Sequence, residues 1–375
     1  MPTQSGNDIL DLKGIEKYRG RKIALVTNHS SLNSKWEWLP ERLAAHGIQP
    51  SLVFSPEHGL FGAAREGEEV GSYFDSRLGA EVVSLYGDRR DMHAEDLADV
   101  DVVIYDMQDA GVRFYTLIST LRSTIDACAA GGRELVVLDR PNPLTGNTVR
   151  GPVLDPDLTS FVGIDTIPLQ YSMTPGELAL YWSAGSDNVR IVEMKGWKRA
   201  KWYDQTGLPF VAPSPNLPDF QSMLLYPGLA VLEGINVSVG RGTTRPFRLI
   251  GAPWLDGHSM LDAVGRVRGI LARYARFVPW YGKFKGEVCE GVEFAVADRS
   301  TANPVLLAMK ILLHLSALEG IQWTGSNGRL WAENITGVKG IDRKISDGSP
   351  GKLIAEWDRD AKKFMKKAEK FLLYS

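Results

Sequence analysis

A carboxylate and an imidazole stand side by side in the segment Ser55 to Gly59, which reads Ser-Pro-Glu-His-Gly. Glu57 can donate or accept a proton, and general acid catalysis favours a glutamate in partly apolar surroundings, which the Leu-Phe pair after Gly59 would supply. The alternative is structural, with Glu57 capping the following backbone or pairing with Arg65 while His58 is a hydrogen-bonded loop histidine. This segment is the first candidate for a reactive site.

A second group of polar side chains follows a later apolar run. Its members are Asp106, Gln108, Asp109, Arg113 and Tyr115. Carboxylates, amides and arginines form directional or bidentate hydrogen bonds, so this group suits sugar hydroxyls and acidic substituents. An ion pair between Asp109 and Arg113 that only closes the loop is the competing interpretation.

Another carboxylate, Glu177, stands near the start of an expected helix. Thr174 is a typical helix cap, and Pro175 suits the first helical position. The spacing from Thr174 to Glu177 matches a capping box, so this glutamate either takes part in chemistry or only stabilises the helix end.

The segment from Gly234 to Phe247 is dense in glycine, hydroxyl and arginine residues. Glycines let the backbone approach a ligand closely, which makes Asn236 and Arg241 candidates for substrate contact; a structural loop packed on Trp254 is the alternative. The glycine spacing is an incomplete dinucleotide fingerprint without a Walker lysine, and the chain has no GxSxG elbow. We therefore predict no nucleotide cofactor, and the scattered histidines predict no metal site.

Four short apolar runs indicate the elements that must position these groups. They are Ile23 to Thr27, Ser51 to Phe54, Asp101 to Tyr105 and Glu134 to Leu138. Segments with helical spacing, such as 38–46 and 116–130, lie between them, and this alternation predicts an α/β fold with a parallel sheet flanked by helices. Polar residues follow the carboxyl end of every run, where open parallel sheets bind ligands. Among these residues are Asn28, Glu57, Asp106 and Arg140.

The length of 375 residues predicts two domains, because one hydrophobic core usually stops growing at a smaller size. A stretch rich in proline, 209–218, marks the expected boundary between a catalytic domain at 1–212 and an α+β ancillary domain at 213–375. In the second half the patterns predict strands at 229–239 and 292–296 and helices at 260–276, 304–318 and 353–373.

The composition argues against several classes of protein. Lys and Arg number 43 against 45 Asp and Glu, so no broad field would attract a nucleic acid or an anionic membrane. Two isolated cysteines, Cys128 and Cys289, predict neither a disulfide framework nor a structural zinc. The polar segment 1–12 lacks the apolar core of a secretory signal and predicts a cytoplasmic protein, although a chain trimmed of its leader would look the same. The oligomeric state is not predicted.

Several segments together resemble one known family of bacterial proteins, long classed as a domain of unknown function and typified by an exo-β-N-acetylmuramidase of cell-wall recycling. The matching segments are LVTNH at 25–29, FSPEHGLFG at 54–62, YDMQDAGVRFY at 105–115, LDRPNPL at 138–144, MTPGELA at 173–179, SPNLP at 214–218 and EGINVSVGRGTTRPFRLIGAPW at 233–254. Each segment is short, but the combination is highly specific. The final third of the chain resembles the family only loosely.

This resemblance implies a Rossmann-like catalytic domain, a smaller C-terminal domain and a cleft that receives the non-reducing end of a peptidoglycan-derived sugar chain. Glu57 becomes the leading catalytic acid and Glu177 the second carboxylate, acting through an oxocarbenium-like transition state without a cofactor. The expected substrate-binding residues are Asn28, His58, Asp106, Gln108, Asp109, Arg113, Tyr115, Arg140, Asn236 and Arg241. From its chemistry, Arg140 or Arg241 would pair with the lactyl carboxylate that distinguishes N-acetylmuramic acid from N-acetylglucosamine.

The chain departs from the family pattern in two places. Tyr171 and Ser172 stand where a His-Gly pair is usual, and Ile235 stands where the family has threonine. A related amino sugar or another acidic glycan is therefore the alternative substrate. A non-catalytic protein that binds peptidoglycan fragments, or a nucleotide-dependent enzyme, would be the rival from another functional class.

Overall fold

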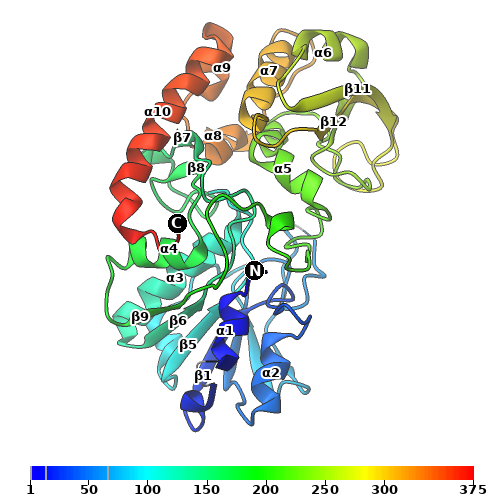
Figure 1. The fold of residues 1–375 in the computed structure, drawn as a ribbon. Coiled ribbons are helices and arrows are strands. Elements are labelled where there is room, and N and C mark those ends of the chain that lie inside the picture. The colour runs from blue at the N-terminus through cyan, green and yellow to red at the C-terminus, as the bar shows by residue number, and fades with distance from the viewer. Residues whose placement is uncertain (1, 13–14, 66) are drawn as a thin grey trace.

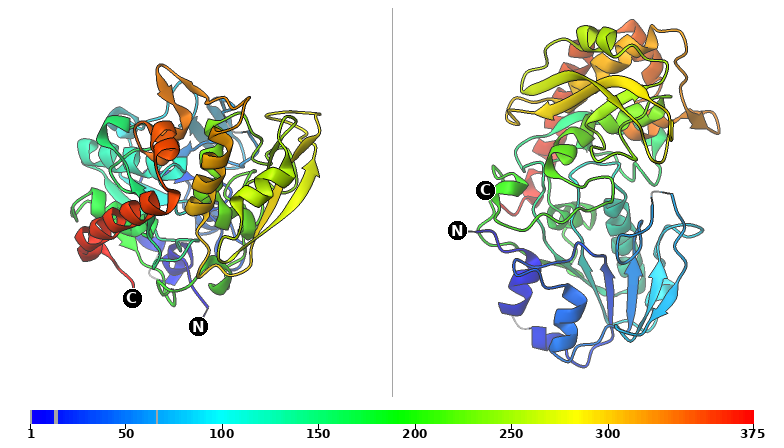
Figure 2. Two further views of the ribbon diagram at one scale, coloured as in Figure 1. Left: turned by 90° about the horizontal axis from the view of Figure 1, so that it is seen from above. Right: turned by 90° about the vertical axis from the view of Figure 1, so that its right-hand side faces the viewer.

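The computed structural model describes residues 2–12, 15–65 and 67–375. These residues form two lobes, which are stacked one above the other in the right-hand view of Figure 2. The first lobe is built on a seven-stranded sheet and the second on a three-stranded sheet (Figure 1). The predicted α/β class with a smaller mixed C-terminal part is confirmed.

The large sheet is parallel except at one edge. Its strands run in the order β3 (Tyr73–Asp75), β4 (Ala80–Ser84), β2 (Leu52–Ser55), β1 (Ile23–Thr27), β5 (Val102–Asp106), β6 (Glu134–Leu138) and β9 (Val189–Val192). Only β3 pairs antiparallel with its neighbour. Four of these strands, β1, β2, β5 and β6, are the predicted apolar runs, and they lie together at the centre of the sheet.

Helices cover both faces of this sheet because successive side chains of a strand point to opposite sides. In β1, Ile23 and Leu25 belong to one buried core, and Ala24 and Val26 belong to the other. The first core also receives α1 (Gly6–Leu12), η1 (Ile15–Tyr18) and α2 (Leu39–Ala45). The second receives η2 (Ala94–Leu97), α3 (Thr116–Gly131) and α4 (Pro175–Trp182). Before the second lobe the chain also forms β7 (Arg150–Val153), η3 (Pro156–Leu158), β8 (Pro168–Gln170) and η4 (Tyr203–Gln205).

The second lobe packs helices against an antiparallel sheet ordered β10-β12-β11. Its elements are α5 (Phe220–Leu229), η5 (Ala230–Gly234), β10 (Leu249–Ala252), α6 (Gly257–Val264), β11 (Ile270–Phe277), β12 (Cys289–Val296), α7 (Pro304–Ser316), β13 (Gly325–Ser326), β14 (Arg329–Leu330), α8 (Trp331–Thr336) and α9 (Ile341–Asp347). The predicted strand at 292–296 and helix at 304–318 are confirmed.

Two predictions for this lobe are wrong. The expected strand at 229–239 is the end of α5 followed by the 3-10 turn η5, because a short run buried on all sides looks alike as helix or strand. The expected helix at 260–276 stops at Gly265, which has a φ of 56°, and the chain continues as β11. Most β11 side chains are exposed or half-buried, so this strand lacks an apolar face that its sequence would reveal.

The chain returns to the first lobe at its end. Helix α10 (Pro350–Ala368) and η6 (Glu369–Phe371) cover most of the predicted terminal helix, and α10 packs against β7. Phe364 and Phe371 both contact the Tyr181 ring edge-on. Figures 1 and 2 show that both termini lie near the junction of the lobes. The domain boundary at 212/213 stays a prediction. No helix among the described residues is long and apolar enough to cross a bilayer.

Candidate active site

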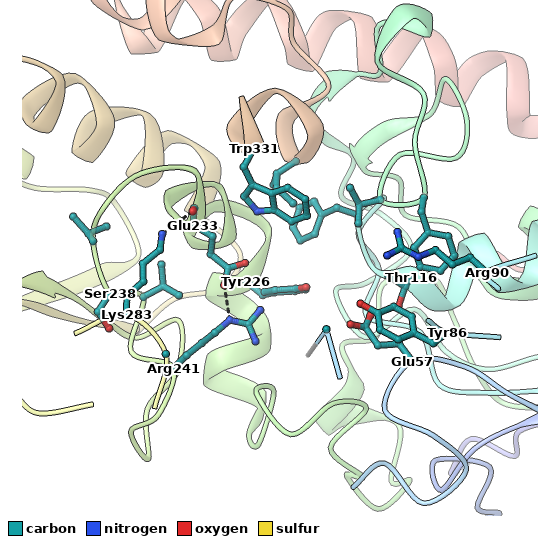
Figure 3. Close-up of a pocket in the computed structure, with 18 residues that line it drawn as sticks. Glu57, Tyr86, Arg90, Thr116, Tyr226, Glu233, Ser238, Arg241, Lys283 and Trp331 are labelled. Atoms are coloured by element: carbon teal, nitrogen blue, oxygen red, sulfur yellow. Dashed lines mark hydrogen bonds and ion pairs between the residues drawn. The ribbon is translucent and has the colours of Figure 1, made fainter. Parts of the chain in front are cut away.

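A cavity of about 490 Å³ lies between the two lobes (Figure 3). The first lobe and the segments that follow it line the cavity with Glu57, Gly67, Tyr86, Arg90, Phe114, Thr116, Phe161 and Val162. The second lobe contributes Tyr226, Glu233, Val237, Ser238, Val239, Arg241, Gly282, Lys283, Trp331 and Ile335. A largely apolar cleft with a few converging polar groups is typical of a small-molecule site, and its size suits a sugar.

Glu57 reaches this cavity because it follows the carboxyl end of β2. The chain turns sharply there, since His58 and Gly59 both adopt positive φ angles and the Gly59 amide donates to the Pro56 carbonyl. Thr116, the first residue of α3, donates its hydroxyl to Oε2 of Glu57 at 2.8 Å. Tyr86 also donates a hydrogen bond to this carboxylate, and burial together with the Glu57 charge raises the pKa of Tyr86 to about 12. Two hydroxyls thus orient one half-buried carboxylate at the cavity wall.

We expect Thr116→Val to lower kcat about tenfold with little change in KM, because it removes a hydrogen bond to a charged group without changing the side-chain shape. Steady-state kinetics with a glycoside as the substrate checks this prediction. The matched control is Thr120→Val, one helical turn further along α3, where the hydroxyl bonds to the Thr116 carbonyl and to no other described residue. An equal loss of activity in both variants would contradict a special role for Thr116.

An aromatic and cationic surface adjoins Glu57. The rings of Tyr86 and Phe161 lie 6.2 Å apart, and the Arg90 guanidinium lies over both of them. Such a surface offers CH groups of a sugar ring an apolar contact beside a fixed charge.

The opposite wall carries the second carboxylate of the cavity. Glu233 accepts a hydrogen bond from Nε of Arg241, and the Arg241 guanidinium also lies 5.1 Å from the Phe247 ring centre. The Tyr226 hydroxyl points into the cavity between this pair and Glu57 (Figure 3). Burial and the Glu233 and Glu57 charges raise the pKa of Tyr226, so it stays a neutral hydrogen-bond donor.

Of the twelve predicted site residues, only Glu57 and Arg241 line this cavity. Asp106 and Arg140, expected as substrate ligands, are instead buried and paired with each other, with Arg140 Nη2 2.9 Å from Oδ2 of Asp106. Asn7 donates to the same oxygen. The polar groups at two adjacent strand ends thus satisfy one another inside the lobe, and neither residue lines the cavity.

Gln108 and Asp109 lie in the same buried layer. The Gln108 amide donates to the carbonyls of Asp109 and Pro141, and Asp109 accepts hydrogen bonds from the Tyr171 hydroxyl and the Gly111 amide. The ion pair between Asp109 and Arg113, which was the competing interpretation, is not among the contacts of the described residues. Burial raises the pKa of Asp109 to about 6 despite these hydrogen bonds.

This raised pKa makes a testable contribution to stability. Between the ordinary value of 3.8 and about 6, the folded Asp109 keeps a proton that the unfolded chain has lost, so stability falls as the pH rises through this window. We expect wild type to lose up to about 3 kcal/mol relative to Asp109→Asn between pH 4 and pH 7. Urea unfolding of both proteins at each pH measures this difference, and a constant difference would contradict the assignment.

Arg113 and Tyr115 hold the structure together rather than face the cavity. The Arg113 guanidinium is fully buried and donates only to backbone carbonyls, and the Tyr115 hydroxyl donates to the Pro213 carbonyl at 2.7 Å. Both residues therefore bind backbone of distant segments instead of substrate.

Glu177 has the structural role that its sequence left open. It forms a capping box with Thr174, pairs with Arg199 at 2.6 Å and accepts a hydrogen bond from the Leu373 amide. The side chain is fully buried and does not line the cavity.

The remaining predicted residues also form hydrogen bonds with other parts of the protein and do not line the cavity. The side-chain oxygen Oδ1 of Asn28 accepts hydrogen bonds from the amide and hydroxyl of Ser30, and Nδ1 of His58 contacts the Ala64 carbonyl. Asn236 bonds to the backbone of Gly320 and Gln322, which matches the structural-loop alternative. Ser172, which replaces a usual glycine, keeps a positive φ of 55°.

The sequence did not single out most of the residues that do line the cavity. Tyr86, Arg90 and Phe161 belong to no motif, and Lys283 and Trp331 lie in the loosely matching final third. Glu233, Val237, Ser238 and Val239 had a signal, because they lie in the matching segment at 233–254, and Phe114 lies in the segment at 105–115. Among the described residues no His, Cys, Asp and Glu cluster could hold a metal ion.

Comparisons with known proteins agree along the whole chain. Profiles for the N-terminal and C-terminal parts of the exo-β-N-acetylmuramidase NamZ family match residues 23–221 and 224–374. A peptidoglycan β-N-acetylmuramidase NamZ of Bacillus subtilis strain 168 is 37% identical over 382 residues, which cover 99% of this chain and 91% of that protein.

Two crystal structures of DUF1343 family proteins from Bacteroides fragilis NCTC 9343 have the same fold. One is 29% identical with a TM-score of 0.89, and the other is 27% identical with a TM-score of 0.78. Each alignment covers 100% of this chain and 99% of the other.

Proposed function

The chain belongs to the exo-β-N-acetylmuramidase NamZ family, and we infer that it is a glycosidase that releases N-acetylmuramic acid from the non-reducing end of peptidoglycan-derived fragments. The observation that carries this function is the Glu57 carboxylate, held by two hydroxyls at the wall of a sugar-sized cavity between the lobes. The cytoplasmic location stays a prediction.

Glu57 is proposed as the general acid that protonates the leaving oxygen of the glycosidic bond. The bond breaks through an oxocarbenium-like transition state, whose positive charge a neighbouring carboxylate stabilises. Water then forms the new bond to the anomeric carbon, and its proton restores the acid. Glu233 replaces Glu177 as the candidate for the second carboxylate, because it is the other acidic group that lines the cavity. The substrate acetamido group is the alternative partner in the displacement.

The function is tested by incubating the protein with a chromogenic β-N-acetylmuraminide and, separately, with the matching β-N-acetylglucosaminide. Release of the leaving group from the muraminide alone supports the exo-muramidase function. Release from the glucosaminide at an equal rate would indicate a less selective hexosaminidase. No release from either substrate by a folded protein would contradict the proposal.

A further inference from the structure

The charges that line the cavity favour an anionic ligand. Three cationic side chains, Arg90, Arg241 and Lys283, stand against two carboxylates, Glu57 and Glu233. Among the described residues, the ion pair recorded between these groups joins Arg241 and Glu233. We propose that Lys283 determines specificity by binding the lactyl carboxylate of the N-acetylmuramic acid unit, an inference that rests on the proposed function.

The ammonium group of Lys283 has one hydrogen to offer. Lys283 lies in the loop between β11 and β12, and its Nζ donates to the backbone carbonyls of Glu233, at 2.8 Å, and Ile235. An ammonium carries three hydrogens, so two are bound to protein oxygens and the third is left for a ligand. Because Lys283 lines the cavity, that ligand is the substrate.

The other two cations are engaged differently. Arg241 is bound to the carboxylate of Glu233, which offsets its charge. Arg90 lies over the Tyr86 and Phe161 rings on the same wall as Glu57 (Figure 3). Among the described residues the hydrogen bonds of Lys283 go to carbonyl oxygens only, which leave its positive charge in place for a carboxylate of the substrate. Its position on the wall opposite Glu57 separates it from Arg90 (Figure 3).

The backbone of the loop holds Lys283 in place before substrate arrives. The Trp280 amide donates to the Gly242 carbonyl at 2.8 Å, and the Gly286 amide donates to the Pro279 carbonyl at 2.8 Å. A Cβ on Gly242 would lie 2.5 Å from the Tyr281 carbonyl oxygen, so glycine allows this close contact. A pre-positioned charge loses little entropy when it binds its ligand, which increases its contribution to affinity.

Lys283 is an exposed residue, so a ligand that enters the cavity can reach its ammonium group. Desolvation lowers the pKa of Lys283, opposed by the nearby Glu233 charge and assisted by Arg241. A hydrogen bond between an ammonium group and a carboxylate is charge-assisted and stronger than one between neutral groups. Lys283 and Glu57 lie on opposite sides of the cavity (Figure 3), so carboxylate recognition and proton transfer occupy different walls.

The experiment compares two substrates that differ only in this charge, a chromogenic β-N-acetylmuraminide and its lactyl methyl ester. We expect wild type to prefer the acid over the ester in kcat/KM by about 30-fold, the typical effect of a charged hydrogen bond. Lys283→Met should lose this preference, mainly through a higher KM for the acid, and Lys283→Arg should retain part of it. The control is Lys285→Met, an exposed lysine of the same loop that does not line the cavity.

The ratio of the two kcat/KM values separates binding from structural support. If Lys283→Met is folded and keeps the wild-type ratio, or loses activity equally on acid and ester, the proposal is overturned. Thermal unfolding of each variant shows whether it is folded. Failure of wild type to hydrolyse the acid at all would instead refute the proposed function.

Discussion

Glu57→Gln is expected to lower kcat on a β-N-acetylmuraminide by about 10³-fold or more, because an amide cannot donate the proton that the leaving oxygen needs. Glutamine has the same shape as glutamate, and its amide oxygen can still accept the hydrogen bond from Thr116. Substrate binding should therefore change less than turnover. The free energy of unfolding should stay within about 1 kcal/mol of wild type.

Turnover is measured from release of the chromogenic leaving group, and stability from thermal unfolding of the same preparations. The matched control is Glu68→Gln, because Glu68 is an exposed carboxylate that follows in the sequence and does not line the cavity. It should keep wild-type activity. Near-normal turnover by a folded Glu57→Gln variant would remove Glu57 from the mechanism.

The sequence predicted the centre of the first lobe well. Strands such as β1 and β5 are buried on both faces, so they appear as continuous apolar runs, and the helices between them have clear apolar stripes. Glu57 was also found from local signals, because Pro56 and Gly59 mark a tight turn directly after β2. A pattern within a few residues was enough for these features.

The rest of the site could not be predicted from local patterns. Polar groups at the ends of parallel strands were expected to face a ligand, but Asp106 and Arg140 neutralise each other in the interior. An ion pair inside a lobe and a ligand site at its surface require the same residue types at the same strand ends. Which of the two forms depends on the depth of the side chains, which sequence spacing does not give.

The second wall of the cavity depends on packing within the second lobe and on how that lobe meets the first. Glu233 and Lys283 are fifty positions apart in the chain and meet because a loop of one hairpin lies against the end of η5. Neither residue has a local signature of catalysis or binding. Contacts between the lobes decide which of their side chains face Glu57, and the hydrophobic pattern of each lobe alone does not contain that information.

One such contact gives the largest expected loss of stability. Arg113→Met is expected to lower the free energy of unfolding by about 4 kcal/mol, because it leaves buried carbonyl groups without a donor. The Arg113 guanidinium donates to the carbonyls of Pro152 and Ile167 and, across the lobe junction, to those of Ile335 and Thr336. Burial lowers its pKa to about 9, so the group still carries its charge at pH 7.

The same substitution should weaken catalysis, because Ile335 and Trp331 of α8 line the cavity and Arg113 binds the carboxyl end of that helix. Urea unfolding measures the stability, and KM for the muraminide reports on the cavity wall at a temperature where the variant is still folded. Arg122→Met is the control, since this partly exposed arginine of α3 pairs with Asp126 at the surface and should change stability by less than about 1 kcal/mol. If both variants are equally stable, the buried guanidinium does not join the lobes, and the position of α8 beside Glu57 must depend on apolar packing alone.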